Sequence, residues 1–175
     1  MQVYPEAYLD IETTGLSPAY SEITVAGVYL VDGTEARFLQ LTGGDITADN
    51  LLEAVEGVRV MYMYNGSRFD LPFINSRLGI NLATLCEHHD LMYDCWRQGL
   101  KGGLKCVEEQ LVIPRCLKGI SGYEAVWLWW RYVNDYDQDA LNTLLEYNKE
   151  DAINLKTLKE RLGCDRSISS LQEGY

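Results

Sequence analysis

Hydrophobic positions follow two different periods along the chain. Short apolar runs bounded by turn residues predict strands, and apolar residues at three- and four-residue spacing predict helices. Asp32-Gly33 is a typical hairpin sequence between two of the apolar runs. The predicted strands are residues 3–12, 22–31, 34–41, 58–64 and 82–86. The sheet is therefore expected to begin with consecutive antiparallel strands.

The predicted helices are marked by signals at their ends. Thr47 is expected to cap a short helix, Pro72 suits the first turn of a helix that begins near Asp70, and Ser121-x-x-Glu124 is a capping box. The predicted helices are 47–55, one from Asp70, one from Asp90, 104–111, 121–133 and 137–162 before Gly163. Strands followed by alternating helices and strands predict an α/β domain with a mixed sheet.

Length and composition fit one globular domain over residues 1–163, followed by a loose tail over 164–175. The chain is 47% hydrophobic but has no apolar run long enough to span a membrane, and its N-terminus lacks a signal-peptide pattern. Its five cysteines are an odd number without a C-x-x-C pair. We therefore expect reduced thiols in a cytoplasmic protein that does not bind membranes.

Acidic residues stand at the ends of predicted elements. In "AYLDIETTG", Asp10 and Glu12 point to the same side of a strand. Asp70 begins a helix after a buried strand, and Tyr147 and Asp151 share one face of the final helix. The hypothesis is that the four carboxylates converge. Such an all-oxygen site suits two Mg²⁺ or Mn²⁺ ions, which clamp both oxygens of an in-line phosphoryl displacement.

Three motifs carry a family resemblance. "DIETTG", "NGSRFD" and "YNKED" resemble, in this order, the motifs of the DEDD 3′–5′ exonuclease superfamily. Tyr147, four residues before Asp151, resembles the DEDDy subclass. "GGLKCVEEQL", "ISGYEAVWLWWRY" and "LLEYNKEDAINL" resemble the YprB-like, predicted-exonuclease branch, and the resemblance covers roughly residues 5–162. It implies a ribonuclease H-like three-layer fold, with a mixed central β-sheet flanked by helices.

The resemblance implies a two-metal 3′–5′ exonuclease that releases nucleoside 5′-monophosphates. Asp10 would bridge both ions, and Glu12 and Asp151 would complete the site that activates water. Asp70 would serve the second ion, and Tyr147 would orient the attacking water rather than act as a strong base. The resemblance also implies contacts with the terminal nucleotide from Thr13, Thr14, Gly15, Leu16, Asn65 and Phe69.

The net charge of −11 restricts the nucleic acid that this chain can bind. Binding along a duplex backbone usually needs many Lys and Arg residues. A single strand or short oligonucleotide with a 3′ end, held mainly through metal ions, suits the charge better. Arg68, Lys101 and Lys105 lie near the motifs in sequence and are either phosphate contacts or ordinary surface cations. The sequence indicates neither DNA or RNA preference nor a protein partner.

Several candidates also have purely structural interpretations. Asp70 suits a helix N-cap, and Tyr147 suits a half-buried helix aromatic. Asp90 is expected to cap a helix rather than bind metal. Cys86, His88 and His89 lack the second ligand pair of a zinc site. One aromatic cluster suits a helix core more than base stacking: Trp127, Trp129, Trp130 and Tyr132.

Two other functions compete with the exonuclease. One is an inactive ribonuclease H-like module that binds nucleic acid or a protein without cutting. The other is a glycosidase, which needs two carboxyl groups and no metal. Four converging acids do not suit a glycosidase, and the intact motifs disfavour an inactive module.

Overall fold

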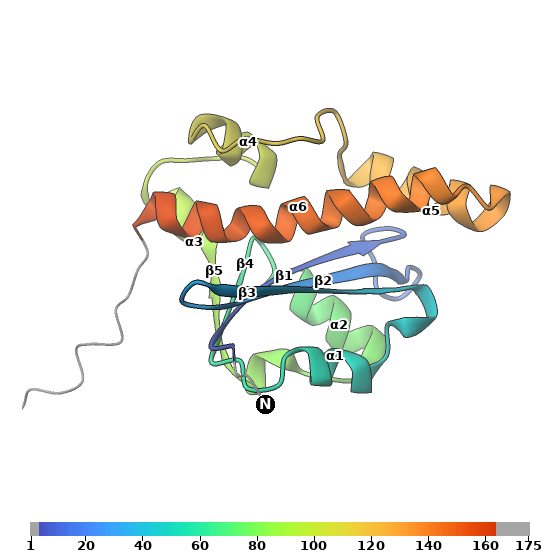
Figure 1. The fold of residues 1–175 in the computed structure, drawn as a ribbon, viewed down its shortest axis with the longest axis horizontal. Coiled ribbons are helices and arrows are strands. Elements are labelled where there is room, and N and C mark those ends of the chain that lie inside the picture. The colour runs from blue at the N-terminus through green and yellow to red at the C-terminus, as the bar shows by residue number, and fades with distance from the viewer. Residues whose placement is uncertain (1–3, 164–175) are drawn as a thin grey trace, which may run out of the picture.

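The computed structural model describes residues 4–163, in which a mixed five-stranded sheet lies between two layers of helices (Figure 1). The strands are β1 (Glu6–Thr13), β2 (Ile23–Asp32), β3 (Glu35–Thr42), β4 (Val60–Met63) and β5 (Glu87–Asp90). Their order in the sheet is β3-β2-β1-β4-β5. The pairs β1–β2 and β2–β3 are antiparallel, and β1–β4 and β4–β5 are parallel. This architecture confirms the predicted three-layer α/β fold.

The helices divide between the two faces of the sheet (Figure 1). On one face lie α1 (Ala48–Ala54) and α2 (Asp70–Leu78). On the other lie α3 (Leu91–Arg97), α4 (Leu104–Gln110), α5 (Gly122–Asp135) and α6 (Gln138–Leu162). Within residues 4–163, no helix is both long enough and apolar enough to cross a membrane. The tail predicted over 164–175 lies outside the described residues.

The central strand β1 sends alternate side chains into two separate cores. Leu9 packs in the core beneath α1 and α2, whereas Tyr8 packs with Leu155 of α6 on the opposite face. Because side chains alternate along a strand, Asp10 and Glu12 face the same side as Tyr8. The strand period therefore directs both carboxylates toward α6.

The predicted end signals are present. The side chain of Thr47 accepts a hydrogen bond from the Asn50 backbone N–H, and both bonds of the Ser121–Glu124 capping box form. The predicted hairpin is confirmed, but its two-residue loop is Gly33-Thr34, because Asp32 pairs with Glu35. Gly33 has φ 58°, a conformation that glycine adopts without strain.

The strand predicted over residues 82–86 is wrong. Leu82–Thr84 is a 3₁₀ helix whose Leu82 is buried in the core beneath the sheet, and the fifth strand is Glu87–Asp90. The apolar run thus serves a turn that packs under the sheet. The true strand is polar because it forms the sheet edge, where Glu87 and His88 are exposed, so apolar periodicity does not mark it.

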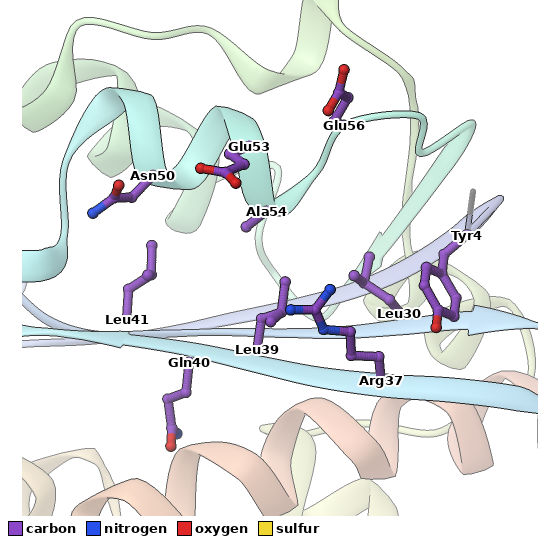
Figure 2. Close-up of a pocket in the computed structure, with 10 residues that line it drawn as sticks. All are labelled: Tyr4, Leu30, Arg37, Leu39, Gln40, Leu41, Asn50, Glu53, Ala54 and Glu56. Carbon is purple, nitrogen blue, oxygen red and sulfur yellow. The ribbon is translucent and has the colours of Figure 1, made fainter. Parts of the chain in front are cut away.

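A cavity of about 300 Å³ lies between β3 and α1, on the face of the sheet opposite α6 (Figure 2). Figure 2 shows that Gln40 points away from the other lining side chains, toward the opposite face. There its Nε2 donates to the backbone oxygen of Leu145 in α6 at 2.9 Å. Strand β3 therefore contributes to both layers.

The packing of α6 on the sheet gives a stability prediction. Leu155→Ala should lower the free energy of unfolding by about 2–5 kcal/mol, because it removes a side chain that is 1% exposed. Urea unfolding followed by circular dichroism measures this change. The exposed Glu160→Ala on the same helix should shift it by only about 0.5 kcal/mol. Equal effects of the two substitutions would contradict the packing.

Candidate active site

Three carboxylates meet between β1 and α6. Asp10, Glu12 and Asp151 each place one oxygen so that these atoms lie within 4.8 Å of one another. Glu12 and Asp151 are buried, and Asp10 is partly exposed. The two-residue period of β1 supplies the first two side chains, and α6, which crosses this face, supplies the third.

The proximity of these groups disfavours their charged forms. Burial raises the pKa of Asp10, and the charges of Glu12 and Asp151 raise it further. Burial and Asp151 likewise raise the pKa of Glu12. The pKa of Asp151 is also raised by burial, although Arg115 and Lys105 oppose that shift. A divalent cation would relieve this repulsion, and carboxylate oxygens are the ligands that Mg²⁺ and Mn²⁺ prefer.

A buried amide holds Asp10 in place. Asn148 is fully buried, and its Nδ2 donates to the backbone oxygen of Asp10 at 3.0 Å and to the carboxylate Oδ2 at 2.9 Å. Gln40 donates to Asn148 Oδ1 at 2.8 Å. In the sheet register, Gln40 pairs with Gly27 and Gly27 pairs with Asp10. Asn148 therefore lies across a row of three residues from three neighbouring strands.

Gly27 makes this close approach possible. A Cβ atom at Gly27 would lie 2.3 Å from Asn148 Oδ1, far inside van der Waals contact. Any larger residue at this position would push α6 or the Asn148 amide away from β1. Gly27 thus allows α6 to pack close to the carboxylates of Asp10 and Glu12 on β1.

Asp70 approaches the site from α2 and is not an N-cap. The N-cap of α2 is Phe69, and Asp70 is the first helical residue. Its Oδ1 accepts a hydrogen bond from the Ile11 backbone N–H at 3.1 Å, between the two acidic residues of β1. Burial raises the pKa of Asp70 to about 7, and its charge raises the pKa of Asp10. Asp70 is thus tied to β1, although it is not one of the three mutually closest carboxylates.

The loop before α2 is braced by Asp90. Asp90 Oδ1 accepts from the backbone N–H of Asn65 at 2.7 Å, and Oδ2 accepts from the Ser67 hydroxyl at 2.6 Å. Oδ1 also accepts from the Met92 N–H at 3.1 Å, which confirms the predicted cap of α3. Asn65 has φ 59°, and its backbone oxygen accepts from the Phe69 N–H at 3.0 Å. One carboxylate therefore shapes the turn that presents Asp70.

Tyr147 is fully buried rather than half-buried, with 3% of its surface exposed. Lys105 Nζ donates to its hydroxyl oxygen and lies 4.1 Å from its ring centroid. Burial raises the pKa of Tyr147, and Asp151 and Glu12 raise it further. The phenol therefore stays neutral and keeps a proton to donate.

Two cations reach Asp151 from α4 and the loop that follows it. Lys105 Nζ lies 4.0 Å from Asp151 Oδ2, and Arg115 Nη2 donates to Oδ1. Arg115 Nη1 donates to the buried Glu108 at 2.6 Å, and Asn154 donates to the same carboxylate at 3.0 Å. Arg115 is thus fixed between two acidic residues beside the three-carboxylate cluster.

The residues expected to contact nucleic acid lie at the end of β1, in the turn that follows it, and in the loop between β4 and α2. Thr14 exchanges two hydrogen bonds of 2.9 Å with Glu22, which fixes the turn after β1. Leu16 follows with 87% of its surface exposed. Thr13 Oγ1 donates to the Gly15 backbone oxygen at 2.8 Å. Their contacts with nucleic acid remain a prediction.

The other candidates separate into contacts and surface residues. Arg68 and Lys101 are exposed, whereas Lys105 contacts the site. Of the aromatic cluster, Trp129 packs against the core, but Trp127 and Trp130 are exposed. In the described part of the chain, Cys86, His88 and His89 belong to no group of ligand atoms close enough together to hold a metal ion.

Sequence reasoning missed four residues that organise the site. Asn148 lies three residues before Asp151, so helical spacing was a signal that could have placed it on the same face. Gly27, Gln40 and Arg115 carry no local signal, because their roles come from contacts between distant segments.

Comparisons with known proteins agree with this architecture. The family model described as the RNase_H superfamily matches residues 7–163. No curated protein matches the chain.

Solved structures with similar folds come from several proteins. The family B DNA polymerase of the archaeon Pyrobaculum calidifontis superposes with a TM-score of 0.70 and 19% identity, covering 92% of this chain but 25% of the polymerase. The apo form of a nuclease superposes with a TM-score of 0.63 and 21% sequence identity, and the match covers 91% of this chain and 72% of the nuclease. Brucella melitensis NrnC bound to pGG superposes with a TM-score of 0.51 and 20% sequence identity, and the match covers 98% of this chain and 92% of NrnC.

The raised pKa of Asp70 predicts a pH dependence of stability without metal. Its folded pKa of about 7 exceeds the ordinary value of 3.8, so this group stabilises the fold at low pH. That contribution is lost as the pH rises through about 7. In EDTA, the unfolding free energy of the wild type should therefore decline between pH 3.8 and about 7, and Asp70→Asn should make this decline less steep. The exposed Asp32→Asn should leave the decline unchanged, and an identical decline in both variants would contradict the assignment.

The clearance at Gly27 predicts a steric effect. Gly27→Ala should lower the free energy of unfolding by roughly 1–3 kcal/mol, because the new methyl group overlaps the Asn148 amide. Chemical denaturation measures this. Gly44→Ala is the matched control, since nothing lies within 4 Å of its Cβ position. A neutral Gly27→Ala would show that α6 is not seated as described.

Proposed function

Because the chain belongs to the RNase_H superfamily, we propose that it is a metal-dependent 3′–5′ exonuclease of the DEDDy, YprB-like type. The observation that carries this proposal is the meeting of Asp10, Glu12 and Asp151 within 4.8 Å, with the Tyr147 phenol one helical turn from Asp151. The intact set of acidic groups favours hydrolysis over an inactive binding module. The reaction would be hydrolysis of the 3′-terminal phosphodiester bond, with release of a nucleoside 5′-monophosphate.

The donor set fits two hard divalent cations. It consists of carboxylate oxygens whose pKa values are raised by burial and by one another, which is the condition that a cation relieves. Asp10, Glu12 and Asp151 would hold the ions, together with Asp70. When bound, Mg²⁺ or Mn²⁺ would supply a water of lowered pKa and would neutralise charge on the phosphate.

Tyr147 would hold the attacking water by hydrogen bonding. Its raised pKa excludes a role as an ionised base at neutral pH. Lys105 donates to the phenol oxygen, so the phenol proton is directed to another acceptor. Asn148 supports the same site by fixing the carboxylate of Asp10. These residues would orient the water and the metal ligands before substrate arrives.

The substrate class follows from charge and from the exposed turn after β1. A chain of net charge −11 suits a short or single-stranded nucleic acid better than an extended duplex. NrnC, which has a similar fold, has a structure with pGG bound, and this likeness supports a short substrate here. The proposed contacts with its 3′-terminal nucleotide come from Thr13, Thr14, Gly15, Leu16, Asn65 and Phe69.

Cleavage of labelled oligonucleotides tests the proposal. Single-stranded DNA and RNA with a 5′ label should shorten from the 3′ end in Mn²⁺ or Mg²⁺ but not in EDTA. Asp10→Asn and Asp151→Asn should abolish cleavage, because each removes a metal-binding charge. Tyr147→Phe should slow it by about 10²-fold, the size of effect that a misplaced reactant can have.

Glu146→Gln is the matched control, because this acidic residue is exposed on the same helix. It should cleave at the wild-type rate. Wild-type activity in Asp151→Asn would refute the site, and shortening from the 5′ end would refute the direction. A chain that binds the oligonucleotides but cuts none of them with either metal would be a binding module.

A further inference from the structure

Arg115 is a largely buried cation with an incomplete set of partners. Its side chain is 9% exposed, and it lies between Glu108, Asp151 and, at 3.5 Å, Glu150. Burial lowers its pKa, but Asp151 and Glu108 raise it by more, so the guanidinium remains charged. Among the buried side-chain polar atoms of residues 4–163, only its Nε lacks a hydrogen-bond partner.

The three nitrogens of the guanidinium have different partners. Nη1 donates to Glu108 at 2.6 Å, which is itself held by Asn154, so this end is anchored. Nη2 donates to Asp151 Oδ1, and Nε donates to no described residue. Nε and Nη2 form one edge of the planar group, and such an edge fits two oxygens of a phosphate or carboxylate.

The present partner of that edge is a proposed metal ligand. Asp151 Oδ1 accepts from Arg115 while Oδ2 faces Lys105 at 4.0 Å, so cations already occupy both sides of the carboxylate. A divalent ion on Asp151 would compete directly with Arg115. Glu150 lies 3.5 Å from Nη2, but its two oxygens already accept hydrogen bonds from the backbone N–H groups of Cys116 and Leu117. Because arginine stays protonated in proteins, the displaced edge, and its Nε above all, needs another anion.

A place for that anion lies beside the residue. The charged residues that line a cavity of about 470 Å³ are three cations, Arg115, Lys105 and Lys118, and two carboxylates, Glu108 and Glu109. Its apolar wall includes Val112 and Leu117. The cations outnumber the carboxylates, and Glu108 is already paired with Arg115. A net positive lining beside an apolar wall suits a nucleotide, which carries a phosphate and a flat base.

We propose that Arg115 is a substrate-binding residue that is held on Asp151 in the metal-free chain. Once Asp151 binds metal, the Nε–Nη2 edge turns into the cavity and binds a phosphate of the nucleic acid, while Nη1 stays on Glu108. This inference rests on the proposed function, because it takes the nucleic acid as the ligand. It adds that metal and nucleic acid bind cooperatively through one side chain.

The variants must preserve the buried surroundings. Arg115→Met alone leaves Glu108 buried and charged without its partner, which can unfold the chain. The test variant is therefore Arg115→Met combined with Glu108→Gln, and Glu108→Gln alone is its background. Arg131→Met is the matched control, since Arg131 on α5 also pairs with an aspartate, Asp137, which caps the start of α6. Circular dichroism establishes that each variant is folded.

The first measurement is Mn²⁺ binding by calorimetry without nucleic acid. The double variant should bind Mn²⁺ about 10-fold more tightly than Glu108→Gln alone, which is the effect of losing one competing charge-assisted hydrogen bond. Arg131→Met should match the wild type. Unchanged or weaker Mn²⁺ binding in the double variant would overturn the competition between Arg115 and metal.

The second measurement is fluorescence anisotropy of a short single-stranded oligonucleotide with phosphorothioate linkages at its 3′ end. In Mn²⁺ the double variant should bind about 10-fold more weakly than its background, and in EDTA the two should bind alike. Equal affinities in Mn²⁺, or an equal loss in EDTA, would overturn the proposal. Both measurements are independent of cleavage, so failure of the exonuclease assay is distinguishable from failure of this inference.

Discussion

Carboxylate oxygens of Asp10, Glu12 and Asp151 lie within 4.8 Å of one another. Without metal, their negative charges repel one another at this distance. The fold resists this repulsion by burying apolar groups on both sides of β1. Leu9 packs beneath the sheet, and Leu155 packs above it in α6. Because the carboxylates share elements with these cores, they cannot separate without disrupting the packing.

The residues around the cluster stabilise its charge in two ways. Beside Asp10 the partner is a neutral amide, Asn148, which donates hydrogen bonds and fixes the carboxylate. Beside Asp151 the partners are the cations Lys105 and Arg115, which oppose the effect of burial on its pKa. The carboxylate of Asp10 is therefore fixed in position by hydrogen bonds. The carboxylate of Asp151, in contrast, can be neutralised either by protein cations or by metal.

Much of this arrangement was predictable from local sequence. The strand period placed Asp10 and Glu12 on one face, and cap residues marked the helix starts. The polar edge strand β5 was not predictable, because edge strands need no apolar alternation. Gly27 and Arg115 were also missed, since their roles depend on contacts with α6 that no local pattern records. Roles drawn from the family resemblance, such as the contact of Leu16 with nucleic acid, remain predictions.

The most direct test of the central claim is the anomalous scattering of Mn²⁺ in crystals of the wild-type chain. We expect anomalous peaks between the carboxylates of Asp10, Glu12 and Asp151, because metal relieves their repulsion. The same crystals prepared with Asp10→Asn should lose these peaks. An excess of Mn²⁺ that leaves the three carboxylates without a peak would show that the cluster is not a metal centre.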